Sequence, residues 1–140
     1  LASPAFDIFF AQRQQVKLFD DSLPALEFLA QRWPIVAVTN GNADVQRIGI
    51  GQFFRDSFNV SRTGFAKPDI RIFHCAAQSL GVPSSAILHI GDDAQLDVVA
   101  GRNAGMQVIW VNREHRDWPV PDQASPMMVS SLAQLCDLLR

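Results

Sequence analysis

Ile87-Leu88-His89-Ile90-Gly91-Asp92-Asp93 is a short apolar run that ends in a glycine and two carboxylates. An apolar run of this length is typical of a strand buried on both faces, as in a parallel sheet. Ile35–Val38 and Val108–Val111 have the same character, and helical patterns over residues 70–80 and 95–104 separate the runs. The alternation over residues 35–111 predicts an α/β fold: a Rossmann-like, three-layer parallel sheet with right-handed helical crossovers.

Weaker patterns on either side complete the expected order of elements. Further helices are expected at Pro4–Leu18, after a cap at Asp21-Ser22, at Ala43–Ile48 and at Leu132–Leu139, and further strands at Ser57–Val60 and Met127–Val129. In a sheet of this kind, the polar residues that follow the strands gather at the carboxyl edge, which is where ligands bind.

The composition suits one globular domain and excludes several classes of protein. The 140 residues are 48% hydrophobic and 19% charged, and the net charge is −2 with no basic run. Nucleic-acid grooves and anionic membrane surfaces favour basic patches, and a bilayer span needs about 18 apolar residues. We therefore expect neither a nucleic-acid nor a membrane partner. Cys75 and Cys136 fit neither a zinc site nor a disulfide framework, which favours a reducing compartment and hence a cytoplasmic location.

The acidic loop after the strand at residues 87–90 is a candidate metal site. Asp92, Asp93 and Asp97 lie close together at the start of a helix, where their charges repel one another unless a cation is present. Mg²⁺ prefers carboxylate oxygens and water, and Gly91 leaves room for a sharp turn. Alternatively, Asp92 or Asp93 only caps the helix and Asp97 is solvated.

Two other polar segments are expected at the same edge. Thr39-Asn40-Gly41 ends the strand at residues 35–38, and its hydroxyl, amide and backbone N–H groups suit a phosphate oxyanion. Lys67-Pro68 precedes the helix at residues 70–80 and brings a compact positive charge. Taken singly, these two segments are better explained as an ordinary turn and a surface lysine.

Together, the three segments resemble the haloacid dehalogenase superfamily. Thr39 matches its second motif, Lys67 its third, and Asp92 with Asp97 its fourth, in the same order and after the same strands. The resemblance covers residues 20–112 well. The stretches around Thr39 and Asp92 look most similar to bacterial flavin-mononucleotide and riboflavin-pathway phosphatases.

The chain departs from this family at the first motif. That motif, Asp-x-Asp at the end of a central strand, supplies the nucleophile and the acid/base, and no Asp-x-Asp occurs in the 140 residues. The resemblance therefore implies that residues 1–19 are the end of a helical cap and that residues 20–140 form a core without its first strand. A segment preceding Leu1 is expected to supply that strand between residues 35–38 and 87–90.

The resemblance implies an activity as well. It predicts a Mg²⁺-dependent phosphomonoester hydrolase that acts on a small phosphorylated metabolite through an aspartyl-phosphate. Because its nucleophile is not in the sequence, the 140-residue chain alone is expected to be inactive. The alternative is a non-catalytic phosphate- or Mg²⁺-binding module that has lost the first motif. A response-regulator-like domain fits less well, because its acidic pair should come earlier and its lysine later in the chain.

Roles follow for the matching residues. Lys67 and Thr39 are the expected catalytic groups and bind phosphate together with Asn40 and Gly41. Asp92 is the expected Mg²⁺ ligand. Asp97 would act through a metal-bound water or by orienting Lys67. Asp93 would hydrogen-bond to the groups that bind the metal without touching the metal itself. The sequence leaves the oligomeric state open.

Overall fold

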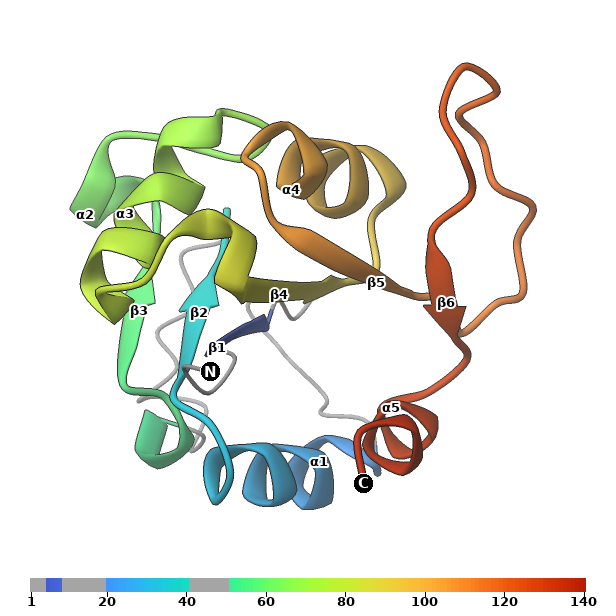
Figure 1. Ribbon diagram of the computed structural model, residues 1–140, viewed down its shortest axis with the longest axis horizontal. Helices are drawn as coiled ribbons and strands as arrows, with labels where there is room; N and C mark the ends of the chain where they lie inside the picture. The colour runs from blue at the N-terminus through green and yellow to red at the C-terminus, as the bar shows by residue number, and fades with distance from the viewer. Residues whose placement is uncertain (1–4, 9–19, 41–50) are drawn as a thin grey trace.

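A six-stranded parallel sheet forms the centre of the computed structural model, which describes residues 5–8, 20–40 and 51–140 (Figure 1). The strands lie in the order β3-β2-β1-β4-β5-β6. Their bounds are Ala5–Ile8 (β1), Ile35–Val38 (β2), Asp56–Phe58 (β3), Ile87–Gly91 (β4), Gln107–Val111 (β5) and Met127–Val129 (β6). Parallel pairing throughout places the carboxyl ends of all these strands at one edge.

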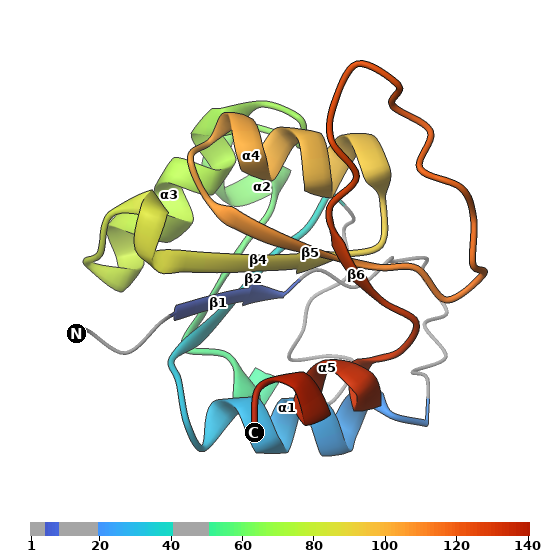
Figure 2. The same cartoon turned by 45° about the vertical axis from the view of Figure 1, so that its right-hand side comes forward.

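Helices cover both faces of the sheet. Figures 1 and 2 show α1 and α5 on one face and α2, α3 and α4 on the other. The helices are α1 (Ser22–Ala30), α2 (Val60–Thr63), α3 (Ile70–Leu80), α4 (Ala100–Asn103) and α5 (Leu132–Leu138), with short turns η1 (Gly51–Phe53), η2 (Ser84–Ala86) and η3 (Ala94–Val99). Within the described ranges, no helix has the length and apolar character needed to cross a bilayer.

The strand residues divide between two cores because successive side chains of a strand point to opposite faces. In β2, Ile35 and Ala37 pack with α1 and α5, whereas Val36 and Val38 pack with α3 and α4. All four are buried, which explains why β2 reads as a continuous apolar run. The two cores confirm the expected three-layer α/β architecture.

Most expected elements are present with small shifts at their ends. The strand expected at Ser57–Val60 is β3, Asp56–Phe58, because Val60 already begins α2. The helix expected over residues 95–104 begins as the π-helical turn η3 and continues as α4. The helix expected at Ala43–Ile48 lies outside the described residues.

The N-terminal segment differs from expectation. Ala5–Ile8 is strand β1, so the helix predicted over Pro4–Leu18 is wrong at these four residues; the rest of it lies outside the described ones. β1 pairs with β2 on one side and β4 on the other, and it thus occupies the central position that we expected a segment preceding Leu1 to fill. Four apolar-rich residues are too few for periodicity to separate strand from helix. Pairing on both edges satisfies backbone groups of β2 and β4 that would otherwise be buried without partners.

Candidate functional site

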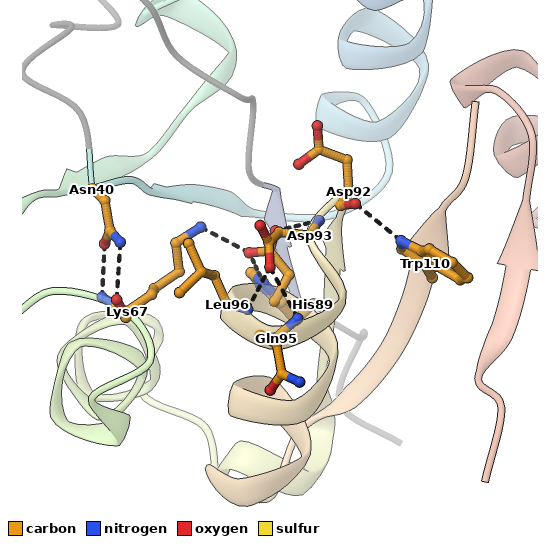
Figure 3. Close-up of polar contacts among 9 residues, drawn as sticks. Asn40, Lys67, His89, Asp92, Asp93, Gln95, Leu96 and Trp110 are labelled. Atoms are coloured by element: carbon orange, nitrogen blue, oxygen red, sulfur yellow. Dashed lines mark hydrogen bonds and ion pairs between the residues drawn. The ribbon is translucent and has the colours of Figure 1, made fainter. Parts of the chain in front are cut away.

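The candidate site residues gather at the carboxyl edge of β2 and β4 (Figure 3). The acidic loop follows β4 directly, and Thr39 and Asn40 follow β2. Lys67 reaches this edge from the segment before α3, next to a cis peptide bond to Pro68. Three segments that are distant in the sequence therefore meet, as the strand order predicts.

Asp97 is the buried centre of this cluster. Its side chain is fully buried, and its Oδ1 atom accepts from Lys67 Nζ at 2.7 Å and lies 2.9 Å from His89 Nε2. Its Oδ2 atom accepts from the Asp93 backbone N–H at 3.1 Å. Burial alone would raise the pKa of Asp97, but the charge of Lys67 and the hydrogen bond from His89 lower it. Asp97 is thus held as a carboxylate, and the idea that it is merely solvated is wrong.

Gly91 makes room for this carboxylate. A Cβ atom built on Gly91 would lie 2.2 Å from Asp97 Cγ and 2.4 Å from its Cβ, far inside ordinary contact distance. Gly91 is not among the glycines with a positive φ, so it is required for space rather than for backbone conformation. The absence of a side chain at Gly91 therefore allows the Asp97 side chain to pack directly against the backbone at the start of the acidic loop.

Asp93 closes the start of η3. Its Oδ1 atom accepts from the backbone N–H groups of Gln95 at 2.9 Å and Leu96 at 2.8 Å. Figure 3 shows this carboxylate turned toward the turn that follows. Asp93 is therefore the capping residue of the loop, which leaves Asp92 for another role.

Asp92 is the outward-facing carboxylate of the loop. Figure 3 shows its side chain pointing away from Lys67 and His89, and it is exposed to solvent. Partial desolvation by the surrounding protein, followed by the charge of Asp97, raises the pKa of Asp92. Among the described residues, no other side chain forms a hydrogen bond or ion pair with its carboxylate. A nearby cation would relieve this destabilised charge.

The donor set fits a sparse magnesium site. Within residues 5–8, 20–40 and 51–140, no three His, Cys, Asp or Glu side chains are arranged to hold a metal ion. Mg²⁺, however, usually keeps several waters and takes only one or two carboxylates plus substrate phosphate oxygens. Asp92 suits the carboxylate role. Asp97 does not suit direct ligation, because both of its oxygens are already engaged.

Asn40 binds the main chain of Lys67. Its Nδ2 atom donates to the Lys67 carbonyl at 2.9 Å, and its Oδ1 atom accepts from the Lys67 N–H at 2.7 Å. The amide side chain expected to hold phosphate thus fixes the lysine segment. Thr39 is almost fully buried, and its N–H donates to the Phe58 carbonyl at 3.0 Å. Gly41 lies outside the described residues.

Sequence reasoning missed the part played by His89. Its place within an apolar strand predicted a core histidine, and it is indeed fully buried. It also contacts Phe73 edge-on, with ring centroids 5.0 Å apart, while its Nε2 atom reaches Asp97. His89 lies in β4 and Asp97 in η3, so no single helical or strand period relates them, and the sequence held no local signal for this contact.

Asp21 has a structural role different from the expected one. It stands at the start of α1 but forms no side-chain cap there. Instead, its carboxylate accepts from the N–H groups of Leu132 at 2.8 Å and Ala133 at 3.3 Å, at the start of α5. Arg113 donates to both of its oxygens, at 2.9 and 3.2 Å. Asp21 thus joins α1, α5 and the segment after β5, and the expected cap of α1 is wrong.

Comparisons with known proteins found a matching family and similar sequences. Residues 4–105 match a family described as hydrolase: haloacid dehalogenase-like hydrolase. Over 105 residues, the chain is 36% identical to the 5-amino-6-(5-phospho-D-ribitylamino)uracil phosphatase YigB of Escherichia coli (strain K12), covering 75% of this chain and 44% of that protein. It is also 36% identical to the pyrimidine 5'-nucleotidase YjjG of the same organism, covering 73% of this chain and 48% of that protein.

A solved structure is similar in fold and sequence. The 2-haloacid dehalogenase from Pseudomonas syringae pv. Tomato DC3000 superposes with a TM-score of 0.84 and 34% sequence identity, covering 89% of this chain and 54% of that one. The chain therefore spans about half the length of the relatives it matches.

Proposed function

Because the chain belongs to the haloacid dehalogenase-like hydrolase family, we propose that it carries the phosphate- and Mg²⁺-binding core of a phosphomonoesterase. The observation that supports this most is the pairing of buried Asp97 with Lys67 beneath an exposed Asp92. The relatives named as phosphatases act on chemically different compounds that share a phosphoryl group. A small phosphorylated metabolite is therefore the proposed substrate class.

Each residue of the core has a distinct task in this proposal. Asp92 would hold Mg²⁺, which when bound neutralises phosphoryl oxygens and assists their approach to a carboxylate. Lys67, fixed by Asp97 and by Asn40, offsets the negative charge that a phosphate adds beside the acidic loop. The Thr39 hydroxyl is proposed to donate to the same phosphate.

The nucleophile is the part for which the described residues offer no candidate. Asp7, the carboxylate of β1, is in register with Val36 and His89. These partners lie three residues before Thr39 and Asp92, so Asp7 is about 10 Å short of the carboxyl edge at about 3.3 Å per residue. Phe9, Phe10 and Ala11 follow β1 in the sequence and bring no carboxylate. The aspartyl-phosphate route therefore needs an aspartate from elsewhere, and the 140 residues alone are proposed to be inactive.

The register of Asp7 also supports the second candidate function. A chain with Lys67, Thr39 and Asp92 but without a nucleophile at the edge can bind phosphate and Mg²⁺ without turnover. This non-catalytic module shares the whole binding site with the phosphatase core and differs only in the fate of the phosphoryl group. Binding of phosphate and Mg²⁺ therefore tests the site that both candidates share, and turnover tests the proposal that the 140 residues contain no nucleophile.

The test measures binding and turnover on the same preparation. Isothermal titration with Mg²⁺ and inorganic phosphate should show phosphate affinity that rises with Mg²⁺ in the wild type. We expect a loss of about tenfold or more in Asp92→Asn and none in Asp137→Asn, a matched change on α5, remote from the site. A phosphate affinity that changes neither with Mg²⁺ nor in Asp92→Asn would refute the proposed site.

The turnover arm uses a generic aryl phosphate. The 140-residue chain is expected to show no hydrolysis. Mg²⁺-dependent hydrolysis abolished by Asp92→Ala would show that the chain contains a working nucleophile, and it would contradict both the proposed inactivity of the 140 residues and the non-catalytic module.

A further inference from the structure

Trp110 contacts the acidic loop through a single polar bond. It lies in β5, in register with Gly91 of β4, and its side chain is almost fully buried. Its indole Nε1–H donates to the backbone carbonyl of Asp92 at 2.9 Å, as Figure 3 shows. This bond joins the strand next to β4 to the residue proposed to hold Mg²⁺.

Asp92 depends on this bond more than its neighbours in the loop do. The Asp93 N–H and carboxylate are engaged by Asp97 and by the start of η3. Gly91 is held in the β4–β5 ladder. Asp92 lies between these fixed points, and among the described residues Trp110 is the one whose side chain binds it. Because the carbonyl and the carboxylate share one Cα, a fixed peptide plane also limits where the carboxylate can point.

The Trp110 ring is itself supported from the side. Trp118 packs against it edge-on, with ring centroids 5.5 Å apart and an interplanar angle of 70°. Trp118 donates to the Gln123 carbonyl at 2.9 Å, and Arg102 of α4 lies over the Trp118 ring and donates to the Ala124 carbonyl at 2.7 Å. The segment between β5 and β6 is thus fastened to α4 on the side of Trp110.

We propose that Trp110 is a positioning residue: its indole N–H holds the Asp92 backbone and thereby orients the Asp92 carboxylate for Mg²⁺. This inference rests on the proposed function. A purely structural role would predict only a loss of stability when the indole is replaced. A positioning role predicts weaker Mg²⁺ binding that exceeds any effect of a similar change in the neighbouring ring.

Trp118 provides the matched control. Both tryptophans donate to a backbone carbonyl at 2.9 Å, and both belong to the same ring pair. Replacement by phenylalanine removes one such bond in each case and keeps an aromatic ring. The two variants differ in the acceptor, which is Asp92 for Trp110 and Gln123 for Trp118.

The experiment titrates Mg²⁺ alone into the wild type, Trp110→Phe, Trp118→Phe and Asp92→Asn. It is followed by ¹H–¹⁵N NMR, with Tm measured in parallel. We expect Mg²⁺ affinity to fall about five- to tenfold in Trp110→Phe and less than about twofold in Trp118→Phe, with similar losses of Tm in both. Equal affinities in the two variants, or a Trp110→Phe variant within twofold of the wild type, would overturn the proposal.

Two further observations separate the possible failures. If the wild type binds Mg²⁺ no better than Asp92→Asn, the proposed metal site itself is wrong and the role of Trp110 falls with it. If Trp110→Phe does not fold, the NMR spectrum of the wild type during the Mg²⁺ titration tests the role of Trp110 instead. The Trp110 indole resonance should then shift with the same Mg²⁺ dependence as the Asp92 amide, while that of Trp33 stays fixed. An indole resonance of Trp110 that does not respond to Mg²⁺ would contradict the proposal.

Discussion

Replacing Gly91 by alanine should disrupt the buried centre of the site. The new Cβ would lie 2.2 Å from Asp97 Cγ, so the Asp97 side chain must retreat by about 1 Å to reach the closest tolerable contact. Its bonds to Lys67 at 2.7 Å and to His89 at 2.9 Å do not survive such a shift. Loss of a partner from a buried ion pair costs about 3–5 kcal/mol, and we expect Gly91→Ala to lose about 3 kcal/mol or more of folding free energy.

Gly101→Ala is the control for this prediction. A Cβ on Gly101 would lie 2.8 Å from a terminal methyl of Val108, which a small shift of the valine relieves. It would lie 3.3 Å from His89 Cδ2, where a shift of a few tenths of an ångström restores ordinary contact. Gly101 is also in α4, where alanine is favoured over glycine by up to about 1 kcal/mol. We therefore expect a net change within about 1 kcal/mol.

Urea unfolding of the two variants at pH 7, followed by far-UV circular dichroism, measures the difference. The expected order is a large loss for Gly91→Ala and a small change for Gly101→Ala. A Gly91→Ala variant that unfolds within about 1 kcal/mol of the wild type would show that Asp97 is not confined as described.

Two other changes test separate parts of the structure. Asp21→Asn should lower the free energy of unfolding by about 1–3 kcal/mol at pH 7. Burial raises the pKa of Asp21, but Arg113 and the amides of α5 lower it by more. The stability that the Asp21 carboxylate contributes is therefore present above the ordinary aspartate pKa and is lost as the pH falls through the lowered pKa. Urea unfolding from pH 7 to pH 3 should show the stabilities of Asp21→Asn and the wild type converging, and parallel curves would contradict this. Asn40→Ala should weaken phosphate binding about three- to tenfold in isothermal titration, because it releases the main chain of Lys67. Asn112 makes an equivalent pair of hydrogen bonds to the main chain of Arg116, and Asn112→Ala should leave phosphate binding unchanged. Equal effects of the two changes would refute the role of Asn40.

The sheet could be predicted from the sequence wherever apolar runs were uninterrupted. The strands at residues 35–38 and 87–90 and the edge strand Met127–Val129 were found in this way. The helix over Ile70–Leu80 was found by its apolar spacing and by Gly81, which ends it in the left-handed region at φ 69°. These elements carry their signals locally.

The missed features depend on contacts between distant segments. Asn40 and Lys67 are 27 residues apart, and Trp110 and Asp92 are 18 apart. Asp21 and Leu132 are 111 apart. No local pattern encodes such pairs, so the sequence predicts Asp21 only as a cap of its own helix and does not predict that Asn40 binds the Lys67 main chain. β1 was missed because its pairing partners, rather than its four residues, make it a strand.

Asp92, Lys67 and Thr39 are proposed to form one Mg²⁺-dependent phosphate site at the carboxyl edge of the sheet. Anomalous diffraction from crystals of the chain soaked with Mn²⁺ and orthovanadate tests it most directly. We expect one Mn²⁺ at coordination distance from an Asp92 carboxylate oxygen, with vanadate beside it and within hydrogen-bond distance of Lys67 Nζ and the Thr39 hydroxyl. A Mn²⁺ bound elsewhere, or vanadate that contacts neither Lys67 nor Thr39, would contradict it.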